Sequence, residues 1–135
     1  MNSNSFTRAS SPVAPVFIWW IIWATILCGL VMIYLFLGRR PPVEGMARGG
    51  SLDYLGLAPL AVSVVLRWLV LPRIDRATAA WPVFVVGLAL GEACGILGIF
   101  LSARPAELFA LGLLGVLQWA PLFAGRYSVA PAGAQ

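Results

Sequence analysis

Residues 87–98 read GLALGEACGILG and lie in the middle of a long apolar run. Four glycines in this stretch share one helix face because they recur every three or four residues: Gly87, Gly91, Gly95 and Gly98. The same stretch contains Glu92, an acid deep inside the run. A charged side chain at that depth in a membrane costs about 2.5 kcal/mol or more. The stretch therefore predicts a membrane-embedded helix with a packing face and a carboxyl group that needs a partner or a role.

The composition of the whole chain is typical of a protein dissolved mainly in lipid. Of its 135 residues, 61% are hydrophobic and 10% are charged. A soluble domain has about a quarter charged residues and under half apolar ones. At roughly 20 residues per membrane span plus short connections, four helices are expected to fill this length. We therefore predict an all-α membrane protein with four transmembrane helices.

The distribution of the charged residues favours some binding partners over others. The formal net charge of +4 comes from nine basic residues against five acids, and every basic residue is an arginine. The arginines lie singly or in pairs at the ends of apolar runs, where their side chains reach lipid phosphates. They do not cluster as a nucleic-acid-binding surface requires. The lipid bilayer is therefore an expected partner, and nucleic acid is not.

Groups for catalysis and metal binding are sparse in the sequence. Histidine, the commonest metal ligand and general base, is absent. The residue pattern contains no nucleophile–base pair, phosphate-binding loop or metal-ligand cluster. Ser63 is as consistent with a bond to a preceding carbonyl as with chemistry. We therefore expect no catalytic residues, no metal site, no cofactor and no enzymatic activity.

Four apolar runs are long enough for membrane-spanning helices, at about residues 16–37, 52–71, 81–102 and 105–123. Trp19, Trp20 and Trp23 near the start of the first run are expected to anchor it at the membrane interface. Pro59 is expected to kink the second helix. Pro82 suits the first turn of the third helix.

The domain organisation follows from these runs. A four-helix transmembrane domain, residues 16–127, is expected between a mobile Ser-rich tail, residues 1–15, and a short C-terminal tail, residues 128–135. The turn at residues 103–105 is so short that the last two helices should form an antiparallel hairpin. We predict two such hairpins, with both termini on the same side of the membrane.

The arginines that flank the helices favour one orientation by a single residue. One set lies on the side of the termini: Arg8, Arg73, Arg76 and Arg126. An equal set lies on the opposite side: Arg39, Arg40, Arg48 and Arg104. Arg67 adds to the first set, and positive charge favours the cytoplasmic side. We therefore expect cytoplasmic termini and a place in a bacterial inner membrane.

Glu92 is the main candidate site residue. It lies about 11 residues, or roughly 16 Å, along the third helix from the turn that follows it, close to the bilayer centre. A lone carboxyl group there should be protonated and able to donate a hydrogen bond, and Gln118 on the fourth helix is within reach. Arg67 is the alternative partner and would keep the carboxyl ionised. A third interpretation is that Glu92 binds a proton or an ion.

The glycine face predicts close helix packing. Two overlapping GxxxG spacings start at Gly87 and Gly91, and such spacings let another backbone approach closely. Gly112 and Gly115 on the fourth helix are the expected neighbours within the chain, and association with another chain is the alternative. Glu92 projects about 60–100° away from the glycines, so the two features could face different partners.

The stretch LALGEACGILGIFL, residues 88–101, resembles the acid-bearing helix of subunit c, the membrane proteolipid of rotary ATPases. In that family a carboxylate in a Glu-Ala-x-x-x-x-Gly-like context binds the translocated proton or sodium ion. The resemblance implies ion binding for Glu92 and packing roles for Gly95 and Gly98. The sequence departs from the family in three ways. Its first helix lacks a glycine ladder, and the polar turn Arg104-Pro105 follows the acid-bearing helix, whereas the family's polar loop precedes it. Gln118 also replaces the second acid of two-hairpin proteolipids.

Over its whole length the sequence resembles small four-helix membrane proteins of bacteria. The features they share are an Ile-Trp…Ile-Tyr first helix, at Ile22-Trp23 and Ile33-Tyr34, and an acid in the third helix. This resemblance implies a fold and no activity. Two hypotheses for function follow. The protein is either a helix-packing or accessory subunit that interacts with other membrane subunits, or a proton- or ion-binding membrane subunit that uses Glu92.

Overall fold

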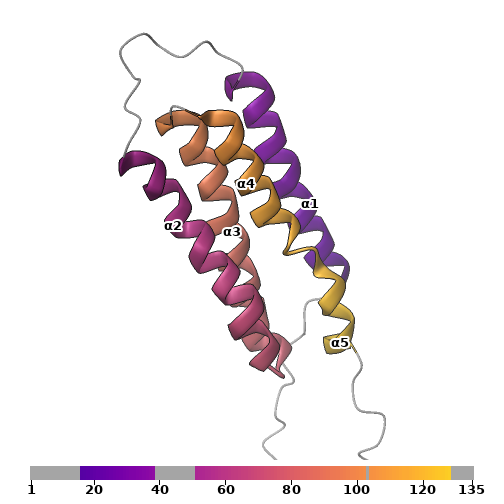
Figure 1. Cartoon of the computed structure of the whole chain (residues 1–135). Coiled ribbons are helices and arrows are strands. Elements are labelled where there is room, and N and C mark those ends of the chain that lie inside the picture. The colour runs from indigo at the N-terminus through magenta and orange to yellow at the C-terminus, as the bar shows by residue number, and fades with distance from the viewer. Residues whose placement is uncertain (1–15, 39–50, 103, 129–135) are drawn as a thin grey trace, which may run out of the picture.

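The computed structural model describes residues 16–38, 51–102 and 104–128, and these residues form helices joined by short connections, with no strand among them (Figure 1). Four of the helical segments are long and apolar enough to cross a membrane: Val16–Gly38, Leu55–Arg73, Ala77–Leu101 and Pro105–Tyr127. The tail predicted at residues 1–15 lies outside the described residues, as does all of the tail predicted at 128–135 except Ser128.

The first two segments each begin as a regular helix and end in a differently wound stretch. α1, Val16–Ile33, continues as the π-helix Tyr34–Gly38. α2, Ser51–Val65, continues as the π-helix Leu66–Val70 and then as a 3-10 turn, Leu71–Arg73. A π-helix has a wider turn, and such turns are found at functional sites more often than regular helix is.

The third segment is one regular helix, α3, Ala77–Leu101. It begins at Ala77, earlier than the predicted start near Trp81. The residue before it, Arg76, has an extended backbone and forms the N-cap of the helix. Pro82 consequently lies inside α3 and not in its first turn. Pro59 lies inside α2 in the same way.

The fourth segment is divided, although the sequence predicted one helix at residues 105–123. Its pieces are α4, Pro105–Leu117, a 3-10 turn, Pro121–Ala124, and α5, Gly125–Ser128. The interruption falls between α4 and the 3-10 turn. This interruption places backbone groups that are not in a regular helix inside an apolar segment.

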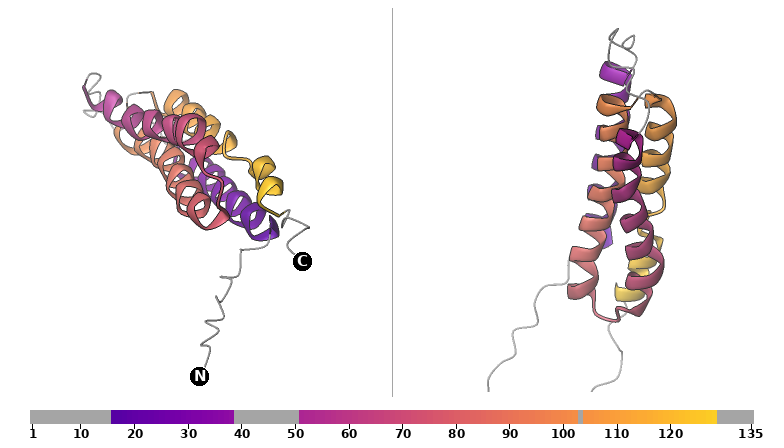
Figure 2. Two further views of the ribbon diagram at one scale, coloured as in Figure 1. Left: turned by 90° about the horizontal axis from the view of Figure 1, so that it is seen from below. Right: turned by 60° about the vertical axis from the view of Figure 1, so that its left-hand side comes forward.

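α3 and the fourth segment form the centre of the molecule. About 39% of the apolar stretch of each of these two segments is buried, against 17% in the second segment and 11% in the first. α3 contacts α1, α2 and α4. In Figures 1 and 2 the start of α1 and the short helix α5 lie at the same end of the molecule, opposite the start of α4. α1 is the most peripheral of the four segments.

Aromatic side chains fill the core at the end where α1 begins. The ring of Trp19 lies 4.8 Å from that of Trp81 and 4.9 Å from that of Phe84, measured between ring centroids. Phe84 in turn contacts Trp119, at 6.1 Å. Trp19, expected as an interfacial anchor, is thus a core residue with 2% of its surface exposed. Trp20, its neighbour, is exposed.

Candidate functional site

The fourth segment is interrupted at residues 118–120, which we call the helix break. Its cause is Pro121, which has no N–H to donate to Leu117 and which disfavours helical geometry in the residue before it. Ala120 accordingly has a ψ angle of 126°, outside the helical range. Gln118, with φ −60° and ψ −20°, is still helical. The chain therefore leaves helical geometry after Gln118, between that residue and the proline.

An interrupted helix leaves backbone carbonyls without partners inside the helix, which is costly in an apolar environment. Side chains from two other segments bind these carbonyls. Arg67 Nε donates to the Gln118 carbonyl at 2.9 Å, and Trp23 Nε1 donates to the Val116 carbonyl at 3.0 Å. The Trp119 amide also donates to Val116, at 3.1 Å. The first and second segments thus hold the break in place.

Ser63 joins α2 and α3 to the break. Its hydroxyl donates to the Gly87 carbonyl at 2.6 Å, and it accepts from Trp119 Nε1 at 2.8 Å and from Gln118 Nε2 at 3.4 Å. The side chain is fully buried, so each bond replaces one that water would otherwise supply. Gly87 lies directly under the Trp119 ring: a Cβ added there would overlap the indole. Only glycine at this position leaves room for Trp119.

Arg67 lies among aromatic rings at the same place. Its guanidinium carbon is 4.8 Å from the centroid of Phe123, 5.6 Å from that of Trp68 and 5.9 Å from that of Trp119. Rings at these distances attract a cation through their π faces. In the described part of the chain Arg67 forms no ion pair.

Trp68 completes a connected group of polar side chains by donating from its indole nitrogen to Gln118 Oε1 at 3.3 Å. We call this group the break cluster: Ser63, Arg67, Trp68, Gln118 and Trp119. It contains one cation and no acid, and its hydroxyl group already has three partners. The cluster is therefore suited to holding the broken helix and contains no pair of groups for proton transfer.

Glu92, the main candidate from the sequence, lies at the edge of the buried face of α3. It follows Leu88 by four residues, which places it about 40° further round the helix. Leu88 is fully buried, Glu92 is half-buried and Ala89 is exposed. The carboxyl group therefore points toward the boundary between the protein interior and its surroundings.

Neither predicted partner bonds Glu92. Gln118 bonds Ser63 and Trp68, and Arg67 bonds the Gln118 carbonyl, so the two candidate partners are joined to each other. The Glu92 side chain forms no hydrogen bond or ion pair within residues 16–38, 51–102 and 104–128. The reason is direction around the helix: Ser63 and Trp119 approach α3 at Gly87, on a different side from Glu92.

Apart from Gly87, the predicted packing glycines lie at three contacts between α3 and α4. Gly91 faces Gly115, and a Cβ added to Gly91 would lie 2.8 Å from the Gly115 carbonyl carbon. Gly112 faces Gly95, and a Cβ added to Gly112 would lie 2.5 Å from the Gly95 Cα atom. Gly98 is covered by Leu108 of α4. The backbones of α3 and α4 therefore touch without side chains between them.

In the described ranges no three acids or cysteines come together in a group that could hold a metal ion. Sequence reasoning missed Trp119 and Pro121, and it assigned Trp23 to an interfacial anchor and not to this site. Pro121 inside an apolar run was the available signal for the break. Comparison of the chain with protein-family models, with curated proteins and with solved structures returned no match.

Proposed function

We propose that this protein is an integral membrane protein that acts as an accessory or interaction subunit, binding another membrane chain through the outward side of α3. Its four apolar segments would form two antiparallel hairpins across the bilayer. We further propose a bacterial inner membrane with the start of α1 and the end of α5 on the cytoplasmic side, where Arg73 and Arg126 would add positive charge. No enzymatic activity is proposed.

The observation that carries this proposal is the unbonded carboxyl group of Glu92. Other polar side chains deep in the segments have partners: Thr25 donates to the Ile21 carbonyl at 2.8 Å, and Ser63 and Gln118 bond one another. Glu92 has none among the described residues. A carboxyl group in lipid without a partner is expensive. A hydrogen-bond donor from a neighbouring membrane helix would remove that cost.

The residues around Glu92 fit a neighbouring helix. Ala89 and Ala93 flank it and are spaced four residues apart, the small-xxx-small spacing that allows close approach of transmembrane helices. Ala89 is exposed, and Ala93 is half-buried. We call Ala89, Glu92 and Ala93 the Glu92 face. This face is separate from the glycine contacts, which α4, Trp119 and Leu30 of α1 already cover.

The test is the protein mass of the assembly extracted from native membranes in mild detergent, measured by size-exclusion chromatography with light scattering. We expect the wild type and Glu92→Gln, which can still form a hydrogen bond, to elute in an assembly larger than the monomer. Ala89→Leu, which blocks close approach, and Glu92→Leu should shift the protein to the monomer.

The matched control is Ala110→Leu, the same substitution at an exposed position of α4. It should leave the assembly intact. A monomer for the wild type, or equal loss of the assembly in Ala89→Leu and Ala110→Leu, would contradict the proposal.

The second candidate function is proton or ion binding by Glu92. It is favoured by the same geometry, because a half-buried carboxyl group without a bonded partner is free to exchange a proton with its surroundings. In that case Glu92 would react in its native membrane with reagents for protonated carboxyl groups. An accessory subunit would instead protect it through the partner helix.

A further inference from the structure

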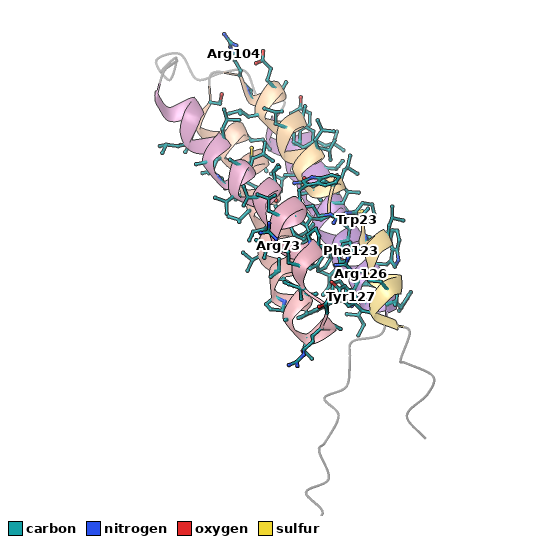
Figure 3. All side chains as sticks on the ribbon, turned by 60° about the horizontal axis from the view of Figure 1, so that its bottom comes forward. Trp23, Arg73, Arg104, Phe123, Arg126 and Tyr127 are labelled. Atoms are coloured by element: carbon teal, nitrogen blue, oxygen red, sulfur yellow. The ribbon has the colours of Figure 1, made fainter. Side chains whose placement is uncertain are left out.

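Two arginines lie close together at the end of the molecule that contains α5. Arg126 Nη2 donates to the Leu71 carbonyl at 2.9 Å, and Leu71 follows Arg67 by about one helical turn. The Arg67 guanidinium lies 4.8 Å from the ring centroid of Phe123, which precedes Arg126 by three residues. In Figure 3, Phe123, Arg126 and Tyr127 are grouped at this end, and Arg104 lies at the opposite end. The pair thus brings two positive charges to one place.

No acid compensates the pair in the described part of the chain. The ion pair found there joins Arg104 to Glu107, at the opposite end of the molecule. Asp75, which follows the second segment by two residues, forms no bond with either arginine. Two like charges at the same end of a molecule repel each other, and an anion between them would remove that repulsion.

Both guanidinium groups retain unused donors. Arg67 bonds the Gln118 carbonyl through Nε, and neither of its terminal nitrogens has an acceptor among the described residues. Arg126 uses Nη2 for Leu71 and for the Tyr127 hydroxyl. Its Nε and Nη1 atoms have no acceptor there. The planar donor edge of an arginine matches two oxygens of a phosphate group.

The surroundings hold the two groups in place. The Arg67 guanidinium lies against Phe123 at 4.8 Å, and that of Arg126 lies 4.8 Å from the Tyr127 ring centroid. The Tyr127 hydroxyl donates to the Ile74 carbonyl at 2.9 Å, which ties α5 to the end of the second segment. Ordered donors lose less entropy when they bind a ligand.

If the segments cross a bilayer as proposed, the two arginines would lie near the depth of the lipid phosphates. Arg67 precedes Arg73, the last residue of its segment, by about 9 Å of helix, within reach of the interface for a long side chain. Arg126 is exposed near the end of the fourth segment. We infer that Arg67 and Arg126 together bind one phosphate group, supplied by an anionic phospholipid. This inference does not depend on Glu92 and goes beyond the proposed function.

The test is native mass spectrometry of the full chain in a neutral detergent, titrated with phosphatidylglycerol or with phosphatidylcholine. The wild type should bind one phosphatidylglycerol in preference to phosphatidylcholine. Arg67→Gln and Arg126→Gln should each weaken that binding about tenfold, because each arginine supplies charge-assisted hydrogen bonds. Arg126→Lys keeps the charge without the donor edge and should also weaken it.

Arg73→Gln is the matched control. Arg73 is exposed at the same end of the molecule, and its substitution by glutamine removes the same charge. It should change binding less than about twofold. Equal binding of the two lipids, or equal weakening by Arg73→Gln and Arg126→Gln, would overturn the inference. Because Arg126 is exposed, Arg126→Gln and Arg126→Lys remain informative if Arg67→Gln fails to fold.

Inorganic phosphate distinguishes the two sources of the anion. If the lipid is the ligand, millimolar phosphate should not displace phosphatidylglycerol from the wild type. If phosphate displaces phosphatidylglycerol from the wild type but not from Arg126→Gln, the two arginines do bind phosphate. That result would overturn the assignment of the phosphate to a lipid.

Discussion

Replacing Trp119 by alanine should lower the free energy of unfolding by about 3–5 kcal/mol, the range for deleting a large buried aromatic side chain. The indole is fully buried, packs on Phe84 and donates to Ser63. Trp119→Phe keeps most of the packing and loses only the N–H, and should cost about 1–2 kcal/mol. Chemical unfolding in mixed micelles, followed by far-UV circular dichroism, measures both values.

Two comparisons make this prediction specific. Trp20→Ala removes an indole that is 37% exposed and should cost less than Trp119→Ala. Gly87→Ala should destabilise the wild type, because its Cβ would overlap the Trp119 ring. In the Trp119→Ala background the same substitution should be tolerated. Additive losses in the double variant would show that Trp119 does not lie over Gly87.

Gly112→Ala should lower the free energy of unfolding by about 3 kcal/mol, the upper end of the usual cost of overpacking. The added Cβ would meet the Gly95 backbone, with the Cα atom at 2.5 Å, and backbone cannot rotate away as a side chain can. Gly91→Ala should act similarly, because its Cβ would lie 2.8 Å from the Gly115 carbonyl carbon. The same unfolding measurement applies.

Gly29→Ala is the control for the glycine substitutions. A Cβ added to Gly29 meets nothing within 4 Å, so the change should alter stability by less than about 0.5 kcal/mol. If Gly112→Ala and Gly29→Ala are equally mild, the backbones of α3 and α4 are not in contact.

The sequence could predict what depends on length and periodicity. Apolar runs long enough for a bilayer predict helices, and four such segments are present. Glycines on one helix face indicate a place of close approach, and the structure has Gly91 against Gly115 there. These inferences work because they concern one helix at a time.

The helix break depends on interactions among segments and was missed. Pro121 was treated as part of an apolar run, although a proline ends regular helix wherever neighbouring groups can bind the freed carbonyls. Those groups are Arg67 and Trp23, which come from two other segments. Their approach depends on how the segments are rotated against each other, which a single sequence does not specify.

Glu92 illustrates the same limit. Depth along the helix made Gln118 and Arg67 candidate partners, but depth does not determine direction around the helix. In the structure Gln118 and Arg67 bond each other, and Glu92 lies on another side of α3. An ionisable residue and its partner must lie at the same depth, and their side chains must also point toward each other. Of these two conditions, only the depth can be counted from the sequence.

The central claim, that a neighbouring membrane chain bonds Glu92, is tested most directly by labelling with dicyclohexylcarbodiimide, which modifies carboxyl groups within lipid. In native membranes we predict little labelling of the wild type and strong labelling of Ala89→Leu, whose Glu92 has lost its neighbour. Glu92→Gln identifies the labelled residue by its lack of reaction. Rapid labelling of the wild type in native membranes, declining as the pH is raised, would contradict the claim and favour proton or ion binding.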